Sequence, residues 1–177
     1  NTYRFDFTTN KKDLFLKMKN NQERILEAAW DNRDPDLPLK NALELLILAS
    51  IVEKEAGNDE DKKKVASVFL NRLKKKMRLQ SDPTVVYSLT KGREPLNREL
   101  NRSDLKTKSP FNTYKIDGLP PSPICNPSKS SIHAVSNPLK TDFLFFVANG
   151  EGGHNFSKNL KQHNRFVKEY RRLKIEN

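Results

Sequence analysis

The pattern of apolar and polar residues is organised around one stretch, LILASIVEKEAG at residues 46–57. The run from Leu45 to Val52 is almost wholly apolar, and only Ser50 interrupts it. Leu, Ile and Ala at this density favour a buried helix over a strand. The run is too short to cross a bilayer, which takes ~20 apolar residues. Gly57 is the residue type that commonly ends a helix, so we expect a buried central helix that stops there.

The same kind of pattern predicts helices on both sides of this run. Apolar residues at helical spacing indicate helices at 9–32, 60–77 and 158–174. A capping residue followed by proline, at Asp82-Pro83 and again at Asn126-Pro127, indicates one short helix from residue 82 and another at 128–136. Thr9 or Asn10 and Asn41 are suitable N-caps for the first and central helices. The short connection after the central helix predicts that it forms an antiparallel pair with helix 60–77.

A small sheet is expected near the C-terminus. The continuous apolar run at 142–148 predicts a strand that is buried on both faces, and the Gly-rich turn after it allows residues 154–156 to return as its partner. Residues 90–125 form a long loop, whose aromatic and apolar content argues against disorder. The expected fold is therefore α+β: a mostly helical domain with a buried central helix and a small antiparallel β-sheet.

Two carboxylates, Glu53 and Glu55, occupy the last turn of the central helix. A helix C-terminus carries partial negative charge, so Lys or Arg would be stabilising there and an ionised Glu is not. That field and partial burial both raise the pKa of a glutamate, and a general acid that works near neutral pH needs a raised pKa. Helical periodicity places the two side chains on different, equally apolar sides and does not choose between them. The alternative is that both extend into water.

The positive charge of the chain is concentrated in its second part. Residues 1–57 carry 9 Lys/Arg and 10 Asp/Glu, whereas residues 58–177 carry 24 and 12. Such a basic portion is typical of proteins that bind nucleic acid, anionic lipid headgroups or an acidic polysaccharide. The alternative is that the basic segments 62–78 and 158–174 are the solvated faces of amphipathic helices.

Few kinds of reaction chemistry are available to these residues. The three His residues lack metal-ligand spacing, the single Cys125 makes neither an internal disulfide nor a zinc knuckle, and no P-loop or Gly-x-Ser-x-Gly elbow is present. What remains is a carboxylate with three polar loop segments, Gln80-Ser81-Asp82, Asn112-Thr113-Tyr114 and His154-Asn155-Phe156. Aromatic rings can stack on sugar faces while amides and hydroxyls pair with sugar hydroxyl or acetamido groups, so this combination favours glycan chemistry.

Five motifs in a fixed order carry a resemblance to a known family. They are ASIVEKEAG, KVASVFLNRL, MRLQSDPTVVYSL, SPFNTYKIDGLPPSPICNP and FLFFVANGEGGHNFSKNLKQHN, and they cover roughly residues 45–170. This succession resembles the catalytic domain of the endolytic murein transglycosylases (the MltG or YceG-like family). Residues 1–40, with Tyr3-Arg4-Phe5, resemble the end of the region that precedes the catalytic core, which would then comprise residues 41–177.

The resemblance implies an activity and a place of action. Family members cut nascent peptidoglycan strands internally between N-acetylmuramic acid and N-acetylglucosamine and leave 1,6-anhydro ends. They act on the extracytoplasmic face of the bacterial cytoplasmic membrane, held by one N-terminal helix that a LysM-like subdomain follows; this sequence contains neither segment. The expected partners are peptidoglycan glycan strands, the glycan polymerases and transpeptidases of wall synthesis, and an anionic membrane surface. No cofactor, metal or nucleic acid is expected.

The resemblance also assigns roles to residues. The essential glutamate of the family falls on Glu55, with Glu53 as the second choice. Residues expected to bind substrate or orient the carboxylate are Gln80, Ser81, Asp82, Asn112, Tyr114, His154 and Asn155. Two alternatives from other classes are a non-catalytic peptidoglycan-binding scaffold and a basic nucleic-acid-binding module.

Overall fold

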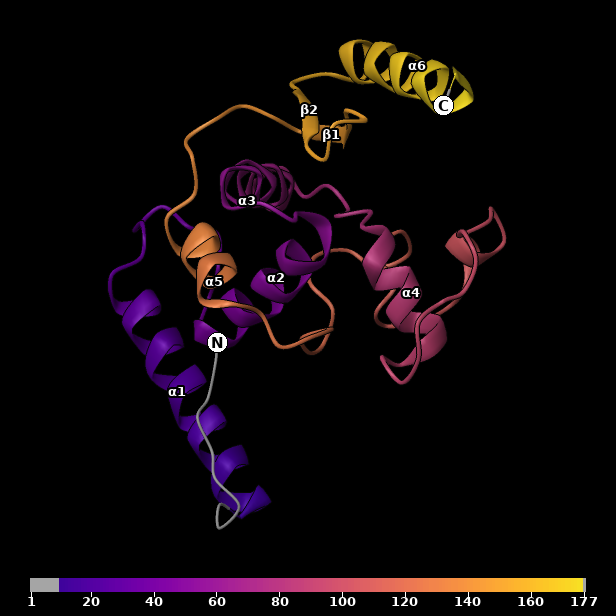
Figure 1. Ribbon diagram of the computed structural model, residues 1–177. Helices are drawn as coiled ribbons and strands as arrows, with labels where there is room; N and C mark the ends of the chain where they lie inside the picture. Colours follow the sequence, from indigo (N-terminus) through magenta and orange to yellow (C-terminus); the bar gives the residue numbers. More distant parts are fainter. Residues whose placement is uncertain (1–9, 177) are drawn as a thin grey trace.

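A computed structural model describes residues 10–176 of the chain, and the Tyr3-Arg4-Phe5 segment and Thr9 lie outside this range. The elements, in chain order, are α1 (Lys11–Asp31), α2 (Ala42–Glu55), α3 (Asp59–Lys74), α4 (Asp82–Thr90), the 3-10 turn η1 (Asp104–Lys106), α5 (Lys129–Ser136), β1 (Phe145–Ala148), β2 (His154–Ser157) and α6 (Leu160–Glu176). Figure 1 shows the helices grouped around α2, with the hairpin and α6 beyond α3. The expected α+β class is confirmed.

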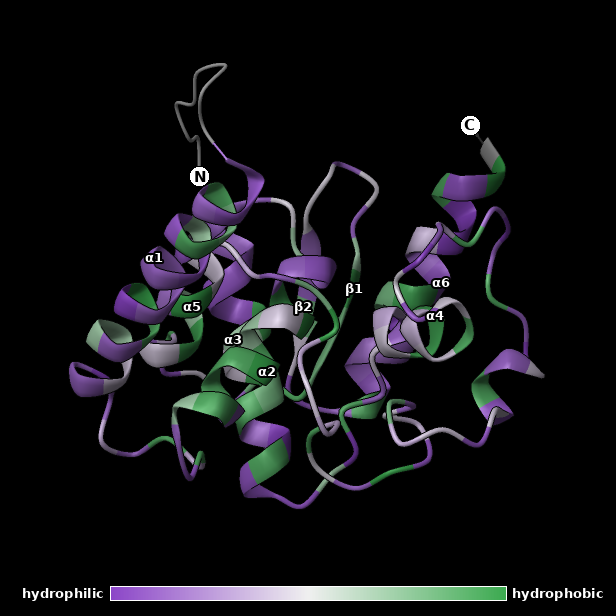
Figure 2. Ribbon diagram, turned by 90° about the horizontal axis from the view of Figure 1, so that it is seen from below, coloured by the Kyte–Doolittle hydropathy of each residue, from purple (hydrophilic) through white to green (hydrophobic). Residues whose placement is uncertain are grey.

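Helix α2 forms the centre of the core. Leu45, Leu48, Ile51 and Val52 are all 0% exposed, and α1, α3, α4 and α5 all contact this helix. A helix that is apolar on all sides has to be buried, and Figure 2 shows α2 as a mostly hydrophobic ribbon in the interior. Burial of one such side chain stabilises the fold by about 1.5–3 kcal/mol. The prediction of a buried central helix is confirmed.

Side-chain caps begin most of the helices, though not always at the expected residue. Asn10 and Asn41 cap α1 and α2 as predicted, since their side chains accept from the amides of Lys12 and Glu44. Two predicted caps were wrong: helix α4 begins after Ser81 rather than Asp82, and α5 begins after Ser128 rather than Asn126. At α5 the reason is a hydroxyl that reaches the Ser131 amide, whereas Asn126 lies too early in the chain.

The end of α2 also differs from expectation. Ala56, with φ −122° and ψ 128°, leaves the helix in extended backbone, and Gly57 does not adopt a left-handed conformation. The helix therefore ends without the glycine cap that its sequence suggested. Figure 1 shows α2 from the side and α3 along its axis, so the two helices cross and do not form the predicted antiparallel pair.

The hairpin is shorter and more exposed than expected. Strand β1 pairs with β2 in antiparallel register, with Val147 opposite Asn155 and Ala148 opposite His154, which confirms the predicted partner. The strand begins at Phe145 rather than 142, and all four of its residues are only half-buried. Phe146 packs edge-on against Phe69 of α3, and Phe145 stacks on His163 of α6. A two-stranded sheet consists of edge strands only, so solvent still reaches both strands despite these helices.

The loop between α4 and α5 is ordered by internal contacts, as its composition predicted. Arg98 makes a two-pronged ion pair with Asp104, at 2.5 and 2.9 Å, and the side chain of Asn112 holds the carbonyls of Leu105 and Thr107. Between residues 10 and 176 no helix is long and apolar enough to cross a membrane.

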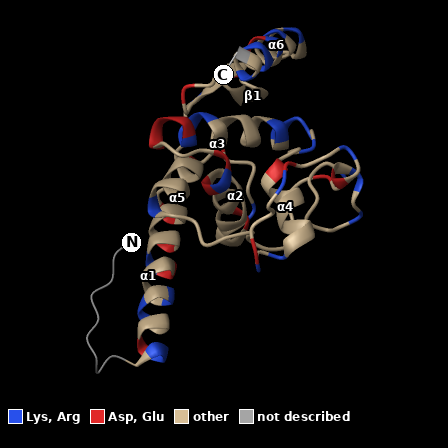
Figure 3. Ribbon diagram, turned by 45° about the vertical axis from the view of Figure 1, so that its right-hand side comes forward, with Lys and Arg blue, Asp and Glu red and all other residues tan. Residues whose placement is uncertain are grey.

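The basic segments lie on α3 and α6. Figure 3 shows α3 with acidic residues at its start and basic residues at its end, and α6 with many basic residues. Within the described part of the chain, helix α6 packs mainly against the hairpin, so much of its surface faces water. On α3, however, Lys62 and Arg72 are each only 7% exposed. The second of these lies beside the cleft that is described next.

Candidate active site

The carboxyl group of Glu55 lies in a cleft of about 460 Å³. Four parts of the chain meet there: the C-terminal end of α2, the end of α3 with the following segment 79–82, the loop that carries Tyr114, and the β-hairpin with the start of α6. Among the predicted site residues, Glu55, Gln80, Asp82, Tyr114 and His154 line this cleft. The structure thus brings together residues that are up to 99 positions apart in the sequence.

Burial dominates the ionisation of Glu55. Removal of water from the carboxylate raises its pKa to about 7, from an ordinary value of 4.5, and the negative charge of Asp82 acts in the same direction. Two groups act against the rise: Ser81, whose Oγ donates to Glu55 Oε1 at 2.5 Å, and the guanidinium of Arg72. At neutral pH this carboxyl group is therefore a mixture of acid and carboxylate, which suits a group that first donates and then accepts a proton.

Glu53, two residues earlier in α2, has the opposite environment. Its Oε2 accepts hydrogen bonds from the backbone amide of Ser128 at 3.0 Å, from Ser128 Oγ at 2.6 Å, and from Ser131 Oγ. The ammonium group of Lys62 lies 3.8 Å away. Burial raises the pKa of Glu53, but these hydrogen bonds and the nearby charge outweigh burial and lower it below the ordinary value. Glu53 is therefore an ionised carboxylate that ties α2 to α5 and does not line the cleft.

The segment that follows α3 holds its conformation through a network of hydroxyl groups. Gln80 has φ 51°, in the left-handed region that non-glycine residues rarely adopt. Its amide donates to Thr113 O at 3.2 Å, and the Ser81 amide donates to Thr113 Oγ1 at 2.9 Å. Thr84 Oγ1 closes the network by donating to Ser81 O at 2.6 Å. Strained backbone of this kind persists where neighbours fix it, often at functional sites, and here it directs Ser81 at Glu55.

Tyr114 and Asp82 form a second pair on the cleft wall. The Tyr114 hydroxyl donates to Asp82 Oδ1 at 2.6 Å, and burial with this carboxylate raises the pKa of the phenol well above its usual range. Asn112 is 0% exposed and lies next to Tyr114 in the buried part of the loop. Its Oδ1 accepts a hydrogen bond from the Tyr114 amide at 3.0 Å, and its side-chain amino group donates to loop carbonyls. Asn112 therefore positions Tyr114 and does not itself line the cleft.

The hairpin contributes His154, the first residue of β2, to the lining of the cleft. Its Nδ1 lies 3.0 Å from Oδ2 of Asp61, a carboxylate in the first turn of α3 that is only 7% exposed. This contact fixes the orientation of an imidazole that lines the cleft. Side chains alternate along a strand, so Asn155 points to the other face, and it is not among the residues that line the cleft.

Arg72 is the main site residue that the sequence analysis missed. Its Nε donates to Leu144 O and its Nη1 to Leu79 O, each at 2.7 Å, and its guanidinium lies 5.3 Å from the centre of the Phe145 ring. One buried cation thus joins α3 to both the hairpin and the segment that carries Ser81. A signal was present: Arg72 follows Val65 by seven positions and Phe69 by three, which places it on the apolar side of α3.

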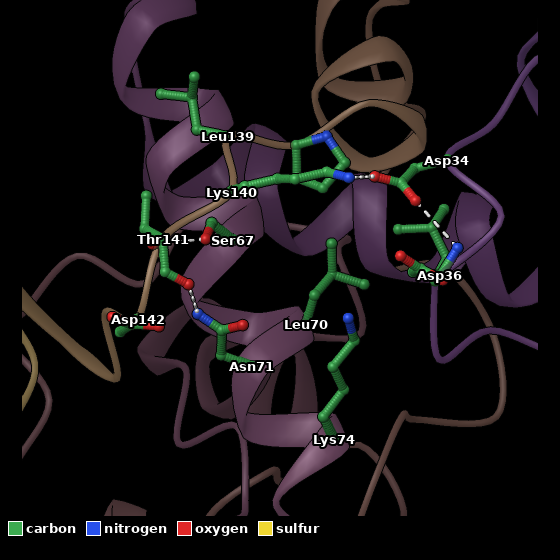
Figure 4. Close-up of a pocket in the computed structure, with 12 residues that line it drawn as sticks. Asp34, Asp36, Ser67, Leu70, Asn71, Lys74, Leu139, Lys140, Thr141 and Asp142 are labelled. Atoms are coloured by element: carbon green, nitrogen blue, oxygen red, sulfur yellow. Dashed lines mark hydrogen bonds and ion pairs between the residues drawn. The ribbon is translucent and has the colours of Figure 1, made fainter.

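A separate hollow lies on the other side of α3, and Figure 4 shows its residues. Its polar groups are largely paired with one another: Ser67 with Thr141 at 2.6 Å, Asn71 with Thr141 O at 2.7 Å, and Lys140 with Asp34 at 3.4 Å. These contacts fix the segment before β1 onto α3. The hydrogen bond from the Asp36 amide and the charge of Lys140 lower the pKa of Asp34, the reverse of what a general acid needs, so the Glu55 cleft is the better candidate for acid–base chemistry. Within residues 10–176 no group of three or more His, Cys, Asp and Glu is placed to hold a metal ion.

Comparisons with known proteins identify the family to which the chain belongs. A model of the YceG-like family matches residues 1–169, so the chain belongs to this family. It is similar to proteins named endolytic murein transglycosylase: 49% identical over 126 residues in Bacillus subtilis strain 168 (71% of this chain and 34% of that protein), and 40% identical over 134 residues in Streptococcus pneumoniae serotype 2 (75% and 24%).

A solved structure supports the fold as well. A putative yceG-like protein from Listeria monocytogenes matches with a TM-score of 0.75 and 37% sequence identity, over 93% of this chain and 52% of that one. The chain spans about a third and about a quarter of the length of the two curated relatives above.

Proposed function

We propose that this chain is the catalytic portion of an endolytic murein transglycosylase, which cleaves the β-1,4 bond between N-acetylmuramic acid and N-acetylglucosamine in peptidoglycan. The family and the names of the relatives support this activity. The observation that carries the proposal for this chain is Glu55, a carboxyl group in a cleft of sugar-binding size whose pKa is raised to about 7.

In this proposal one carboxyl group performs both proton transfers. Protonated Glu55 gives its proton to the glycosidic oxygen as the bond from that oxygen to C1 of the muramic acid breaks. The carboxylate that results removes the proton from the 6-hydroxyl of the same sugar, and O6 forms the new bond to C1. Water is not consumed, so the reaction differs from glycoside hydrolysis, which uses a pair of carboxyl groups.

The surrounding residues support these two steps. Ser81 donates to Glu55 Oε1 and so stabilises the carboxylate that exists between the two proton transfers. The negative charge of Asp82 raises the pKa of Glu55 and so favours the protonated form of its carboxyl group. We assign substrate contacts to Gln80, Tyr114 and His154, whose side chains line the cleft, and a positioning role to Asn112.

The substrate polymer, the cellular location and the partner proteins are part of the same proposal. Peptidoglycan strands are its substrate, and it acts on the extracytoplasmic face of the bacterial cytoplasmic membrane, beside the glycan polymerases and transpeptidases of wall synthesis. The basic surface of α3 and α6 then faces an anionic membrane or glycan surface. The division into a lead-in at 1–40 and a catalytic core at 41–177 stays a prediction.

The test is a digestion of purified peptidoglycan by this chain and, in parallel, by the full-length protein, followed by mass spectrometry of the released muropeptides. Products that end in 1,6-anhydro-muramic acid, absent with Glu55→Gln, are expected. Products with reducing ends would mean that water, rather than the 6-hydroxyl, attacks C1 of the muramic acid. Binding without any product would instead favour a scaffold, and salt-sensitive binding of DNA or RNA would favour a nucleic-acid-binding module.

A further inference from the structure

A second groove lies beside the Glu55 cleft and shares a wall with it. Its volume is about 640 Å³, and it runs along α4 between the end of α2 and the segment 92–95. Asp82 lines both hollows. Lys54 and Glu55 are neighbours on the last turn of α2, where successive side chains point about 100° apart. One of them therefore lines the groove and the other the cleft.

The inner surface of this groove combines an apolar floor with unpaired polar groups. Helix α4 directs Thr84, Val85 and Ser88 into the core and presents Pro83, Val86, Tyr87 and Thr90 to the groove. Within the part of the chain that the structure describes, the charged groups of Lys54 and Arg93 make no ion pair or hydrogen bond, although both side chains are exposed at its rim. Apolar rings and donor groups of this kind match a sugar, which has an apolar face and a polar edge.

We propose that this groove is a further saccharide subsite that holds the same glycan strand on one side of the bond to be cut. This inference rests on the proposed function. An enzyme that cuts within a strand needs contacts with sugars on both sides of its acid, and the Glu55 cleft includes no residue of α4 beyond Asp82. The groove continues past Asp82 on the α4 side. The two hollows together then form one path for an extended strand.

The experiment compares Val86→Trp, which fills the groove, with Leu89→Trp as a matched control. Leu89 is on the same helix and 37% exposed, but it lines neither hollow. Both changes are placed in the Glu55→Gln background so that strands are bound but not cut. Affinity is measured for peptide-free N-acetylglucosamine–N-acetylmuramic acid oligomers of increasing, defined length.

The expected result is a length-dependent loss. The affinity of the Glu55→Gln parent should rise as oligomers become long enough to enter the groove. Val86→Trp should remove that gain, which corresponds to a loss of affinity of about tenfold or more for one anchored sugar ring. Leu89→Trp should keep the gain. With Glu55 restored, end-labelled long oligomers should be cut at shifted positions by Val86→Trp. A general loss of folding does not shift the cutting position.

Three results would overturn the subsite. The first is that the two tryptophan variants bind oligomers of every length with equal affinity. The second is that Val86→Trp lowers the affinity by the same factor for all lengths. The third is that Val86→Trp lowers the affinity only for strands that carry peptides, which would mean that the groove binds the stem peptide. If the wild-type protein cuts no glycan, the proposed function fails, but the binding series still decides whether the groove holds sugars.

Discussion

The two sides of the last turn of α2 show how one helix gives two glutamates opposite properties. Glu53 meets three hydrogen-bond donors and the ammonium group of Lys62, whereas Glu55 meets one donor, Ser81, and a second carboxylate. The pKa of Glu53 is lowered and that of Glu55 is raised to about 7. The helix dipole acts on both residues, so the difference comes from their tertiary neighbours.

A carboxyl group keeps its proton at neutral pH where burial removes water and few hydrogen-bond donors or positive charges replace it. Glu53 is stable as an ion and joins two helices. The ionised form of Glu55 is destabilised by burial, so this carboxyl group keeps its proton up to a higher pH. The first of these residues serves the fold and the second serves the chemistry that we propose.

The largest expected effect is the contrast between the two glutamates in catalysis. Glu55→Gln should lower kcat for peptidoglycan cleavage by about 10³-fold, within the range of 10²–10⁴ that general acid–base catalysis contributes. Glu53→Gln keeps the shape of the side chain outside the cleft and should lower kcat by less than about tenfold. Rates are measured by release of soluble muropeptides. Equal losses in the two variants would contradict the division of roles.

The next effect is the pH dependence of stability. Since the folded-state pKa of Glu55 is about 7 and the ordinary value is 4.5, the folded protein keeps this proton at pH values where the unfolded chain releases it. The stability that the neutral form provides is complete below pH 4.5 and is lost as pH rises through 7, roughly 3 kcal/mol in all. Glu55→Gln is neutral throughout, so urea denaturation should show it gaining stability relative to wild type between pH 5 and pH 8. A difference that does not change with pH would contradict the raised pKa.

Glu53 should show the opposite behaviour. Glu53→Ala leaves the hydroxyls of Ser128 and Ser131 without this acceptor and removes one of the two carboxylates beside Lys62, which should lower the free energy of unfolding by about 2 kcal/mol at pH 7. Because the pKa of Glu53 is lowered, its contribution is present above pH 4.5 and is lost as pH falls below that value. Thermal unfolding measures both. The control is Glu60→Ala, an exposed partner of Lys64 that should cost less than about 1 kcal/mol.

The smallest effect concerns the single donor to Glu55. Ser81→Ala removes the hydrogen bond that stabilises the carboxylate, so the pKa of Glu55 should rise further and the alkaline limb of the pH–rate profile should move to higher pH. The maximal rate should fall about tenfold, which corresponds to about 1.4 kcal/mol. Ser88→Ala is the matched control, because the Ser88 hydroxyl donates to Thr84 O within its own helix α4. A limb that does not move with Ser81→Ala would show that the two side chains do not interact during catalysis.

Local sequence predicted the elements well and their contacts poorly. The density of Leu, Ile and Ala in α2 is a local property, and it indicated a buried helix with glutamates at its end. The choice between Glu53 and Glu55 is not local, because Ser128 and Ser131 lie at least 75 positions after Glu53 and Ser81 lies 26 after Glu55. Only the resemblance to a family singled out Glu55, and its catalytic role stays a prediction.

Other site features depend on which side of an element faces a neighbour. Asp61 has the sequence position of an ordinary first-turn acid, yet it is buried against His154. Arg72 lies in a basic segment but points inward. Asn112 has the chemistry of a sugar ligand, but the loop carbonyls use its amide. In each case a contact with a distant segment decides the role, and the spacing of residues in one helix or loop does not contain that information.

A titration of the Glu55 carboxyl group itself tests most directly whether the cleft contains an acid at neutral pH. Carbon-13 NMR of the glutamate side-chain carboxyls, with Glu55→Gln and Glu53→Gln used to assign the two signals, gives both midpoints in one experiment. Glu55 is expected to titrate near pH 7 and Glu53 below 4.5. A Glu55 midpoint near 4.5 would contradict this expectation, because the cleft would then contain no acid at neutral pH.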